Sequence, residues 1–217
     1  MRKTIISLIF FSILLFSNCK KDTCSSNESS DPDTSDIIVY KPNIYIYPIE
    51  TIELEVKLDF PQGGSVIESI PKYNEGWNIT VDTSGLINNE YRYLFYECKV
   101  PNLFQYDRGW IIKGENLTHF FQNNLAESGF SNEEILDFIE YWIPLLDSST
   151  AYRIYPQYKD VISSIIGLIF SKEPDNLLRL FYVIKENSSL NVHLHEPEIP
   201  EFQREGYFVV EWGVILK

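Results

Sequence analysis

The stretch LTHFFQNNLAESGFSNEEILDFIEYWIP, residues 117–144, contains the clearest helical pattern in the chain. Its apolar residues recur every three or four positions, which is typical of the buried face of a helix. These residues are Leu117, Phe120, Phe121, Leu125, Ile135, Phe138, Ile139 and Trp142. Gly129 is placed to end a first helix, and Ser131 with Glu134 forms a capping box that begins a second. The stretch therefore predicts a two-helix hairpin with one apolar face.

The chain on both sides of this hairpin favours β-strands. Before the hairpin, alternating or aromatic-rich runs indicate strands at residues 44–47, 52–58, 66–70, 77–81 and 91–98. Prolines bracket the first of these strands, so we expect it to be short or to lie at a sheet edge. After the hairpin, strands are indicated at residues 152–155, 165–170, 178–185 and 206–216. The predicted fold class is α+β, a mostly antiparallel sheet layer with the two-helix hairpin packed on it.

One part of this prediction stays open. Residues 160–170 are compatible with a helix as well as with a strand at 165–170. If the strand forms, the turn at residues 172–176 favours a hairpin between it and the strand at 178–185.

The N-terminus has the layout of a secretory signal peptide. Arg2 and Lys3 form a basic start, thirteen apolar or small residues follow at positions 4–16, and Ser17 and Asn18 form a short polar exit. Thirteen residues are too few for a spanning helix, which needs about 20. The sequence therefore predicts an exported chain rather than one with a permanent N-terminal membrane helix.

Residues 15–19, Leu-Phe-Ser-Asn-Cys, resemble the lipobox of bacterial lipoproteins, where the cysteine is lipidated before the signal peptide is cut off. The resemblance implies that Cys19 carries the lipid and anchors the protein, since two or more acyl chains hold a protein stably on a membrane. Phe16 and Asn18 depart from the usual motif, so an ordinary signal peptide that ends near a cysteine is the alternative.

This interpretation divides the chain into three parts. Residues 1–18 are the lipoprotein signal peptide, residues 19–36 are the lipidated cysteine with a polar tether, and residues 37–217 are one globular domain. We expect the protein to be exported and lipid-anchored to the cell envelope, with the outer membrane favoured, on its periplasmic or surface face. As a flexible coil, the tether would hold the domain roughly 20–25 Å from the anchor.

Charge and cysteine content narrow the possible partners. The formal net charge of −13 disfavours nucleic-acid binding, which depends on Lys and Arg contacts to phosphates. Apart from Cys19, the cysteines are Cys24 in the tether and Cys98 in a predicted strand. A disulfide between them is conceivable in an oxidising compartment, but we prefer a buried Cys98 and a free or externally oxidised Cys24.

No known catalytic motif is present, so carboxylates are the main catalytic candidates. Glu97, Glu115, Glu140 and Glu211 each lie beside aromatic residues. A pair such as Glu97 and Glu211 would allow glycosidic hydrolysis if the two carboxyl groups faced one cleft. The alternative is that each carboxylate bonds backbone amides or Arg179. His193 and His195 share one face of a strand, but a solvated pair is favoured, and we expect neither a metal nor a cofactor.

Six segments resemble an uncharacterised family of bacterial exported proteins. They lie at residues 41–48 (KPNIYIYP), 93–97 (YLFYE), 109–115 (GWIIKGE), 138–144 (FIEYWIP), 179–181 (RLF) and 209–213 (VVEWG). The resemblance implies one intact domain and no particular activity. Tyr96 and Val214 depart from the pattern, where the family has Trp and Gly.

The aromatic residues of these segments are the candidate binding surface. They are Tyr96, Trp110, Trp142 and Trp212, which form either a stacking platform or part of a β-rich core. We favour a non-catalytic binding or interaction module of the envelope, with a glycan or an envelope protein as partner. The alternative is a hydrolase of glycans or peptidoglycan that uses paired carboxylates.

Overall fold

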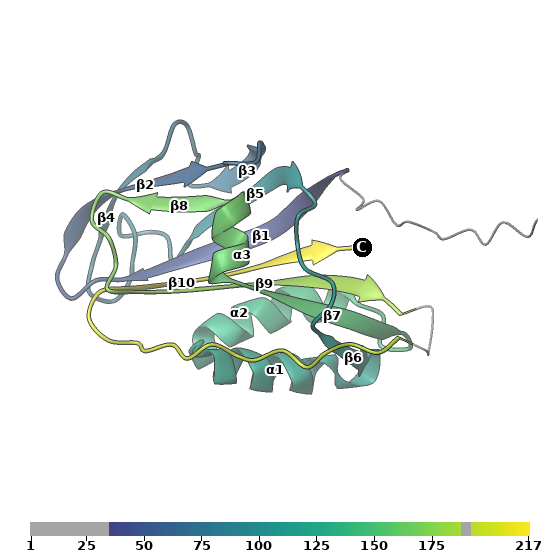
Figure 1. The fold of residues 1–217 in the computed structure, drawn as a ribbon. Coiled ribbons are helices and arrows are strands. Elements are labelled where there is room, and N and C mark those ends of the chain that lie inside the picture. The colour runs from purple at the N-terminus through teal and green to yellow at the C-terminus, as the bar shows by residue number, and fades with distance from the viewer. Residues whose placement is uncertain (1–34, 188–191) are drawn as a thin grey trace, which may run out of the picture. The chain divides into compact units, whose positions relative to one another are not determined.

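The computed structural model describes residues 35–187 and 192–217 (Figure 1). Over these residues the protein is an α+β domain with a seven-stranded sheet, a three-stranded sheet and three α-helices. The predicted fold class is confirmed, because the larger sheet is mostly antiparallel and two joined helices pack on it.

The larger sheet forms the middle layer. Its strands, in spatial order, are β3 (Ser65–Ile70), β5 (Leu94–Pro101), β1 (Asp36–Tyr47), β10 (Phe208–Leu216), β9 (Asn176–Glu186), β7 (Ala151–Tyr158) and β6 (Trp110–Lys113). All neighbouring pairs are antiparallel except β10 and β9, which are parallel. A parallel pair requires the chain to return along the sheet. The residues 192–207, called here the crossover segment, belong to this return (Figure 1).

The smaller sheet covers one face of the larger one. It consists of β4 (Trp77–Val81), β2 (Ile52–Asp59) and β8 (Gly167–Phe170), and α3 (Lys159–Ile165) packs beside it. Alternate residues of β2 are buried, so this strand has the predicted wet face. A core of aliphatic and aromatic side chains fills the space between the two sheets.

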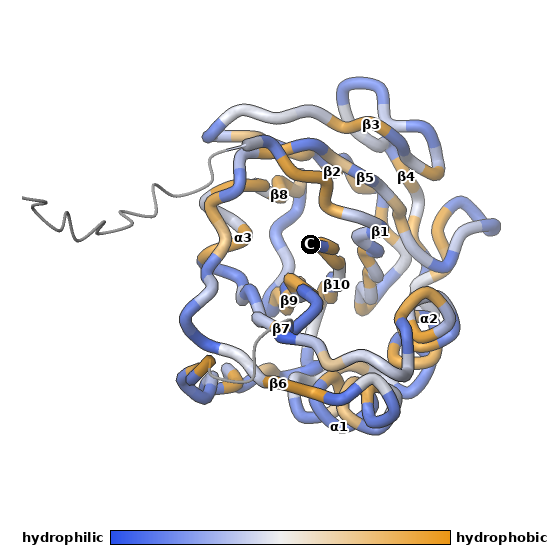
Figure 2. The backbone as a smooth tube through the Cα atoms, turned by 90° about the vertical axis from the view of Figure 1, so that its right-hand side faces the viewer, coloured by the Kyte–Doolittle hydropathy of each residue, from blue (hydrophilic) through white to orange (hydrophobic). Residues whose placement is uncertain are grey.

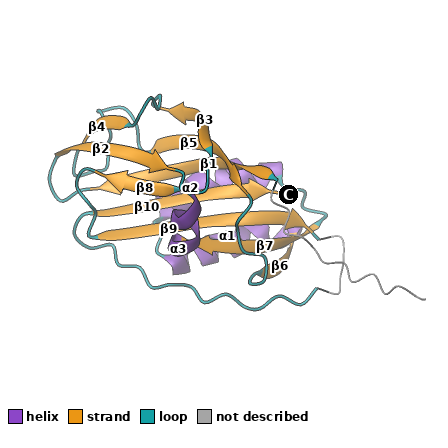
Figure 3. Ribbon diagram, turned by 45° about the horizontal axis from the view of Figure 1, so that its top comes forward, coloured by secondary structure: helices purple, strands orange, loops and turns teal. Residues whose placement is uncertain are grey.

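The helical hairpin covers the other face. α1 (Leu117–Ser128) and α2 (Asn132–Trp142) are each flanked by a short 3-10 turn, Gly114–Asn116 before α1 and Ile143–Leu145 after α2. Figure 2 shows the layers end-on, with α1 and α2 on one side of β10 and with β2 and β8 on the other. In Figure 3 the same two helices lie behind the strands, on the side away from α3. The larger sheet is therefore buried on both faces.

The ends of the two helices follow the sequence prediction. Gly129 adopts a left-handed conformation with φ of 103° and ends α1. The Ser131 hydroxyl accepts a hydrogen bond from the Glu134 amide, and the Glu134 carboxylate accepts one from the Ser131 amide at 2.7 Å. Gly129 and this capping box fix the tight turn that lays α2 beside α1.

The prediction that the strand at residues 44–47 is short or lies at a sheet edge was wrong. These residues belong to β1, a twelve-residue strand in the sheet interior, and Ile44 and Ile46 face one core while Tyr45 and Tyr47 face the other. Pro42 is accommodated because the register of β1 shifts against both neighbours around it. A bulge tolerates a residue without an N–H group in a central strand.

Two further strand predictions need correction. The strand at 91–98 begins later, at Leu94, and the uncertain region at 160–170 contains both predicted elements, α3 followed by β8. The expected hairpin between residues 165–170 and 178–185 is wrong. β8 pairs with β2 in the smaller sheet, whereas β9 pairs with β7 and β10 in the larger one.

Candidate functional site

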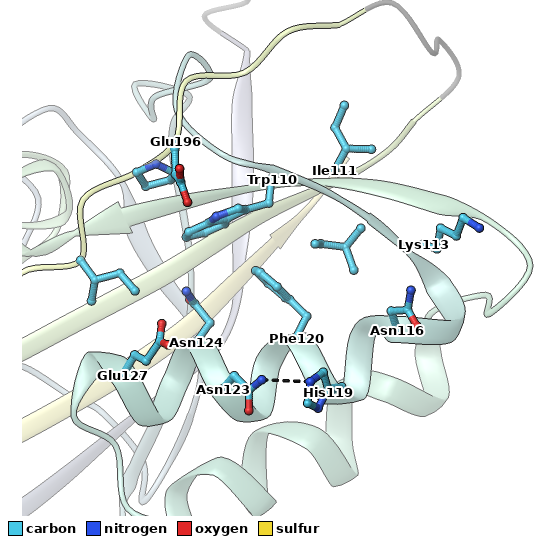
Figure 4. Close-up of a pocket in the computed structure, with 13 residues that line it drawn as sticks. Trp110, Ile111, Lys113, Asn116, His119, Phe120, Asn123, Asn124, Glu127 and Glu196 are labelled. Atoms are coloured by element: carbon cyan, nitrogen blue, oxygen red, sulfur yellow. Dashed lines mark hydrogen bonds between the residues drawn. The ribbon is translucent and has the colours of Figure 1, made fainter.

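A groove of about 690 Å³ lies between α1, the edge strand β6 and the crossover segment (Figure 4). We call it the α1 groove. Three exposed residues of α1 line the groove, namely His119, Asn123 and Glu127. Asn116, in the turn just before α1, is also exposed and continues this line of residues. Their spacing of three and four residues places them in one row, because residues so spaced are neighbours on a helix surface.

Trp110 is the central aromatic residue of the α1 groove. It begins β6, is half-buried, and meets the ring of Phe120 edge-on with 5.2 Å between the ring centres. Figure 4 shows both rings directed into the space between β6 and α1. The contact with Phe120 fixes the indole, so that the groove offers a rigid, partly apolar surface.

Amide and imidazole groups surround this surface. The side chains of Asn123 and His119 are hydrogen-bonded at 3.1 Å. Asn124 uses its carbonyl oxygen to accept a hydrogen bond of 2.6 Å from the Tyr182 hydroxyl in the core. That bond fixes the orientation of the amide, and in Figure 4 the Asn124 side chain points toward Trp110.

The crossover segment forms the third wall and is fastened at two places. Beside the groove, the Gly109 amide donates to the His195 carbonyl at 2.9 Å, and the His195 amide donates to the Asp107 carbonyl at 3.1 Å. Farther along, both amino groups of Arg204 donate to the Glu134 carboxylate at 2.9 Å. Glu196, on this wall, lies on the opposite side of Trp110 from Phe120 (Figure 4). The arrangement can stack a flat ligand on Trp110 and bond its polar edges.

Of the four aromatic binding candidates, only Trp110 lies on a concave surface. Tyr96, Trp142 and Trp212 are at most 1 % exposed, so the prediction that they form a binding surface is wrong. Tyr96 and Trp212 lie on central strands of a sheet that is covered on both faces, and Trp142 lies on the buried face of α2. These three side chains fill the core, which agrees with the alternative that the aromatic residues form part of a β-rich core.

The structure does not bring Glu97 and Glu211 together as a catalytic pair. Glu211 is completely buried beside Tyr96, on the face of the larger sheet that meets the smaller sheet. Glu97 follows Tyr96 in β5, so its side chain points to the opposite face, where it lines a surface pocket. The pairing needed for glycosidic hydrolysis is therefore contradicted. Glu115 and Glu140 are exposed surface residues.

Glu211 instead accepts hydrogen bonds from Arg179, the partner considered as the alternative. The Arg179 Nε donates to Glu211 at 2.5 Å, the Tyr96 hydroxyl donates to Glu211 at 2.8 Å, and both charged groups are fully buried. Burial, and then the charge of Glu211, raise the pKa of Tyr96 well above its usual range, so the phenol keeps its proton and donates. Arg179 also donates to the carbonyl of Ile166 at 2.6 Å, which ties the end of α3 to β9.

The surroundings of the cysteine and histidine candidates that the structure describes do not indicate a reactive thiol or a metal site. Cys98 is a free thiol and is fully buried, as the preferred interpretation of the sequence expected. Burial, and to a smaller extent the charge of Glu211, raise the pKa of this thiol. Cys19 and Cys24 lie outside the described residues. His193 and His195 are exposed, and their ring centres are 5.9 Å apart. Within residues 35–187 and 192–217, no group of three or more His, Cys, Asp or Glu side chains could hold a metal ion.

Sequence reasoning missed most of the α1 groove. The row of Asn116, His119 and Asn123 reads as an ordinary solvated helix face, because a groove appears only when β6 and the crossover segment lie opposite. The one sequence signal was Trp110, which follows Gly109 in the resembling segment at residues 109–115 and was named as a binding candidate. A Cβ at Gly109 would lie 2.4 Å from the Ile154 carbonyl oxygen, so this glycine permits the close approach that seats Trp110.

Comparisons with known proteins give no assignment for this geometry. No protein-family model, curated protein or solved structure matches the chain significantly. Among the described residues, the helices are too short or too polar for any of them to traverse a lipid bilayer.

Proposed function

We propose that the protein is an envelope lipoprotein, anchored through Cys19, whose domain binds a glycan in the α1 groove. The observation that carries the ligand class is the half-buried indole of Trp110 with amide and imidazole groups beside it. Ligand sites combine an apolar surface with a few fixed polar groups that set orientation. A sugar ring has an apolar face that suits the indole and hydroxyl groups at its edge that suit the amides.

The charge of the site agrees with this ligand class. Glu127 and Glu196 lie on two walls of the groove, and Lys113 is the cation that lines it. Because carboxylates accept hydrogen bonds from hydroxyl groups, a neutral or amino-bearing glycan fits these walls better than an anionic polymer does. A binding role also requires no nucleophile or paired acid and base.

Replacing Trp110 by Ala is expected to weaken glycan binding by about ten-fold or more, because truncating an aromatic hot-spot residue costs about 2 kcal/mol or more, and about 1.4 kcal/mol corresponds to ten-fold. Binding is measured on a glycan array that includes soluble peptidoglycan fragments, followed by calorimetry with the best ligand. Asn123→Ala changes an exposed residue of the same groove, so it is expected to weaken binding without affecting folding.

The matched control for this experiment is Tyr141→Ala, which removes an aromatic ring that is 42 % exposed and lies outside the groove. Its affinity for the glycan should equal that of the unaltered protein. Failure of the unaltered protein to bind any glycan at micromolar concentration, or capture of an envelope protein that ignores Trp110 and Asn123, would refute the proposal.

Replacing Cys19 by Ala is expected to abolish lipid attachment and leave soluble or uncleaved protein, because the thiol is the acceptor in the proposed anchor. Metabolic labelling with a palmitate analogue and fractionation of membranes measure the two effects. Cys98→Ala is the control that should retain both the label and the membrane fraction. Continued labelling of the Cys19 variant would contradict the anchoring proposal.

A further inference from the structure

A second pocket, of about 500 Å³, opens between β3, β5, the residues before β5 and α2. We call it the Lys41 pocket, since Lys41 of β1 lines it together with Tyr93, Phe95 and Tyr141. Its lining residues are all different from those of the α1 groove. Its volume lies within the range of roughly 300–1,000 Å³ that is usual for small-molecule sites.

Lys41 is held in an unusual position. It has φ of 51° at the bulge of β1, a left-handed conformation that few residues other than glycine adopt. Its Nζ lies 4.5 Å from the ring centre of Tyr141, 5.3 Å from that of Phe95 and 5.7 Å from that of Tyr93. The three rings hold the ammonium group through cation–π contacts at the pocket wall. Strained residues persist where surrounding contacts fix them, which is common at ligand sites.

The ammonium group of Lys41 has no ion-pair partner in the described part of the chain. No carboxylate oxygen of residues 35–187 or 192–217 lies within 4.0 Å of its Nζ. Burial lowers the pKa of Lys41, against the raising effect of the Asp137 and Glu97 charges. The second cation of the pocket, Arg92, is already engaged, because it bonds Asp137 at 3.2 Å. Lys41 is thus the cation that is left to receive an anionic group.

Two carboxylates of the same pocket have no cation within salt-bridge distance in the described part of the chain. Glu68 of β3 and Glu97 of β5 are directly opposite each other in the strand register, and both line the pocket. Neither forms an ion pair within 4.0 Å among the described residues. Burial, and then the charge of Glu68, raise the pKa of Glu97, against the lowering effect of a hydrogen bond from the Lys41 backbone amide and of the Lys41 charge. Like charges directly opposite on neighbouring strands are destabilising, so a cation between them would be favourable.

From these features we infer that the Lys41 pocket binds a small zwitterion of the amino-acid type, which goes beyond the glycan site proposed above. The ligand carboxylate faces Lys41, the ligand ammonium faces Glu68 and Glu97, and an apolar side group packs against Tyr141. Each charged group of the ligand then meets a charged group of the pocket that forms no salt bridge within 4.0 Å among the described residues. Such complementarity selects for a ligand that carries both charges.

A simple ammonium site accounts for less of the geometry. A ligand with only a positive charge can face Glu68 and Glu97, but it offers no anion to the ammonium of Lys41, which the rings of Tyr93, Phe95 and Tyr141 hold at the pocket wall. A ligand with only a negative charge would be repelled by Glu68 and Glu97. The zwitterion satisfies both sets of groups without moving Lys41.

The test uses three probes of matched size on the full-length protein, titrated by calorimetry at neutral pH. L-Phenylalanine carries both charges, phenethylamine only the positive one and 3-phenylpropionate only the negative one. L-Phenylalanine is expected to bind about ten-fold or more tightly than either analogue. Equal binding of phenethylamine and phenylalanine, or no binding of phenylalanine at millimolar concentration, overturns the inference.

Variants then assign each charge to its partner. Lys41→Met should weaken phenylalanine binding about ten-fold but should not weaken phenethylamine binding, because the amine has no carboxylate to face Lys41. Glu97→Gln should weaken phenylalanine binding but should not weaken 3-phenylpropionate binding, because it removes a charge that repels the anion. Lys99→Met removes an exposed lysine of β5 outside the pocket and should change nothing. Tyr141→Ala changes an exposed residue of the pocket and should weaken the binding of phenylalanine. This variant keeps the site testable if the Lys41→Met protein is unstable. Phenylalanine affinity that survives all three pocket substitutions would also refute the site.

Discussion

Replacing Arg179 by Met is expected to lower the free energy of unfolding by about 3–5 kcal/mol, because it leaves the Glu211 carboxylate buried without its cation. Both side chains have no exposed surface, and Nε of Arg179 lies 2.5 Å from the Glu211 oxygen. The same substitution removes the hydrogen bond to the Ile166 carbonyl, so the end of α3 loses a tie to β9. Urea denaturation followed by circular dichroism measures the change.

Two controls separate the burial of a charge from the loss of packing. The double variant Arg179→Met/Glu211→Leu removes both charges and is expected to recover a large part of the lost stability, since an apolar replacement of a buried pair is often neutral. Arg92→Met removes an ion pair to Asp137 at a site where the Arg92 side chain is 53 % exposed, and is expected to cost about 0–1 kcal/mol. If Arg179→Met cost no more than Arg92→Met, the buried pair would not be a main stabilising element of the fold.

Replacing Phe138 by Ala is expected to cost about 3–5 kcal/mol, because it creates a cavity under the centre of α2. Phe138 is fully buried, and its ring centre lies 4.9 Å from that of Phe121 and 5.2 Å from that of Trp212. It therefore joins α1, α2 and β10 in one cluster. Thermal and urea unfolding measure the loss.

Leu136 is the matched control for Phe138, because it lies on the same helix and is 51 % exposed. Leu136→Ala is expected to change the stability by no more than about 0.5 kcal/mol. Phe138→Leu keeps part of the volume and should fall between the two variants. Similar losses for Leu136→Ala and Phe138→Ala would show that α2 is not held by its predicted apolar face.

The local parts of the fold were predictable from sequence. Gly129 and the Ser131–Glu134 capping box determine helix ends through bonds among residues close in sequence, and the alternation of β2 determines which face is buried. The layer arrangement depends on contacts between distant segments. The pairing of β8 with β2 and the parallel pairing of β9 with β10 have no local signal, so the predicted hairpin of residues 165–170 and 178–185 was wrong.

The candidate sites were predictable only in part, for the same reason. Glu97 and Glu211 look alike in sequence, since both lie in aromatic strands, but strand alternation places them on opposite faces. Trp110 and Trp212 also look alike, yet one lies on the short edge strand β6 and the other in the centre of the sheet. Whether a strand lies at the edge or in the centre of a sheet depends on the strand order. The hydrophobic pattern of a single strand does not reveal that order.

The placement of β10 between β1 and β9 has a consequence for how the domain folds. β1 and β10 are the first and last strands in the described sequence, so one side of β1 cannot pair until the chain as far as β10 has been synthesised. Sheets that depend on such sequence-distant pairing fold slowly, and unpaired strand edges favour aggregation during the delay. We therefore expect refolding to be limited by the insertion of β10 and to be sensitive to protein concentration. A chaperone that protects the open edge of β1 should raise the yield.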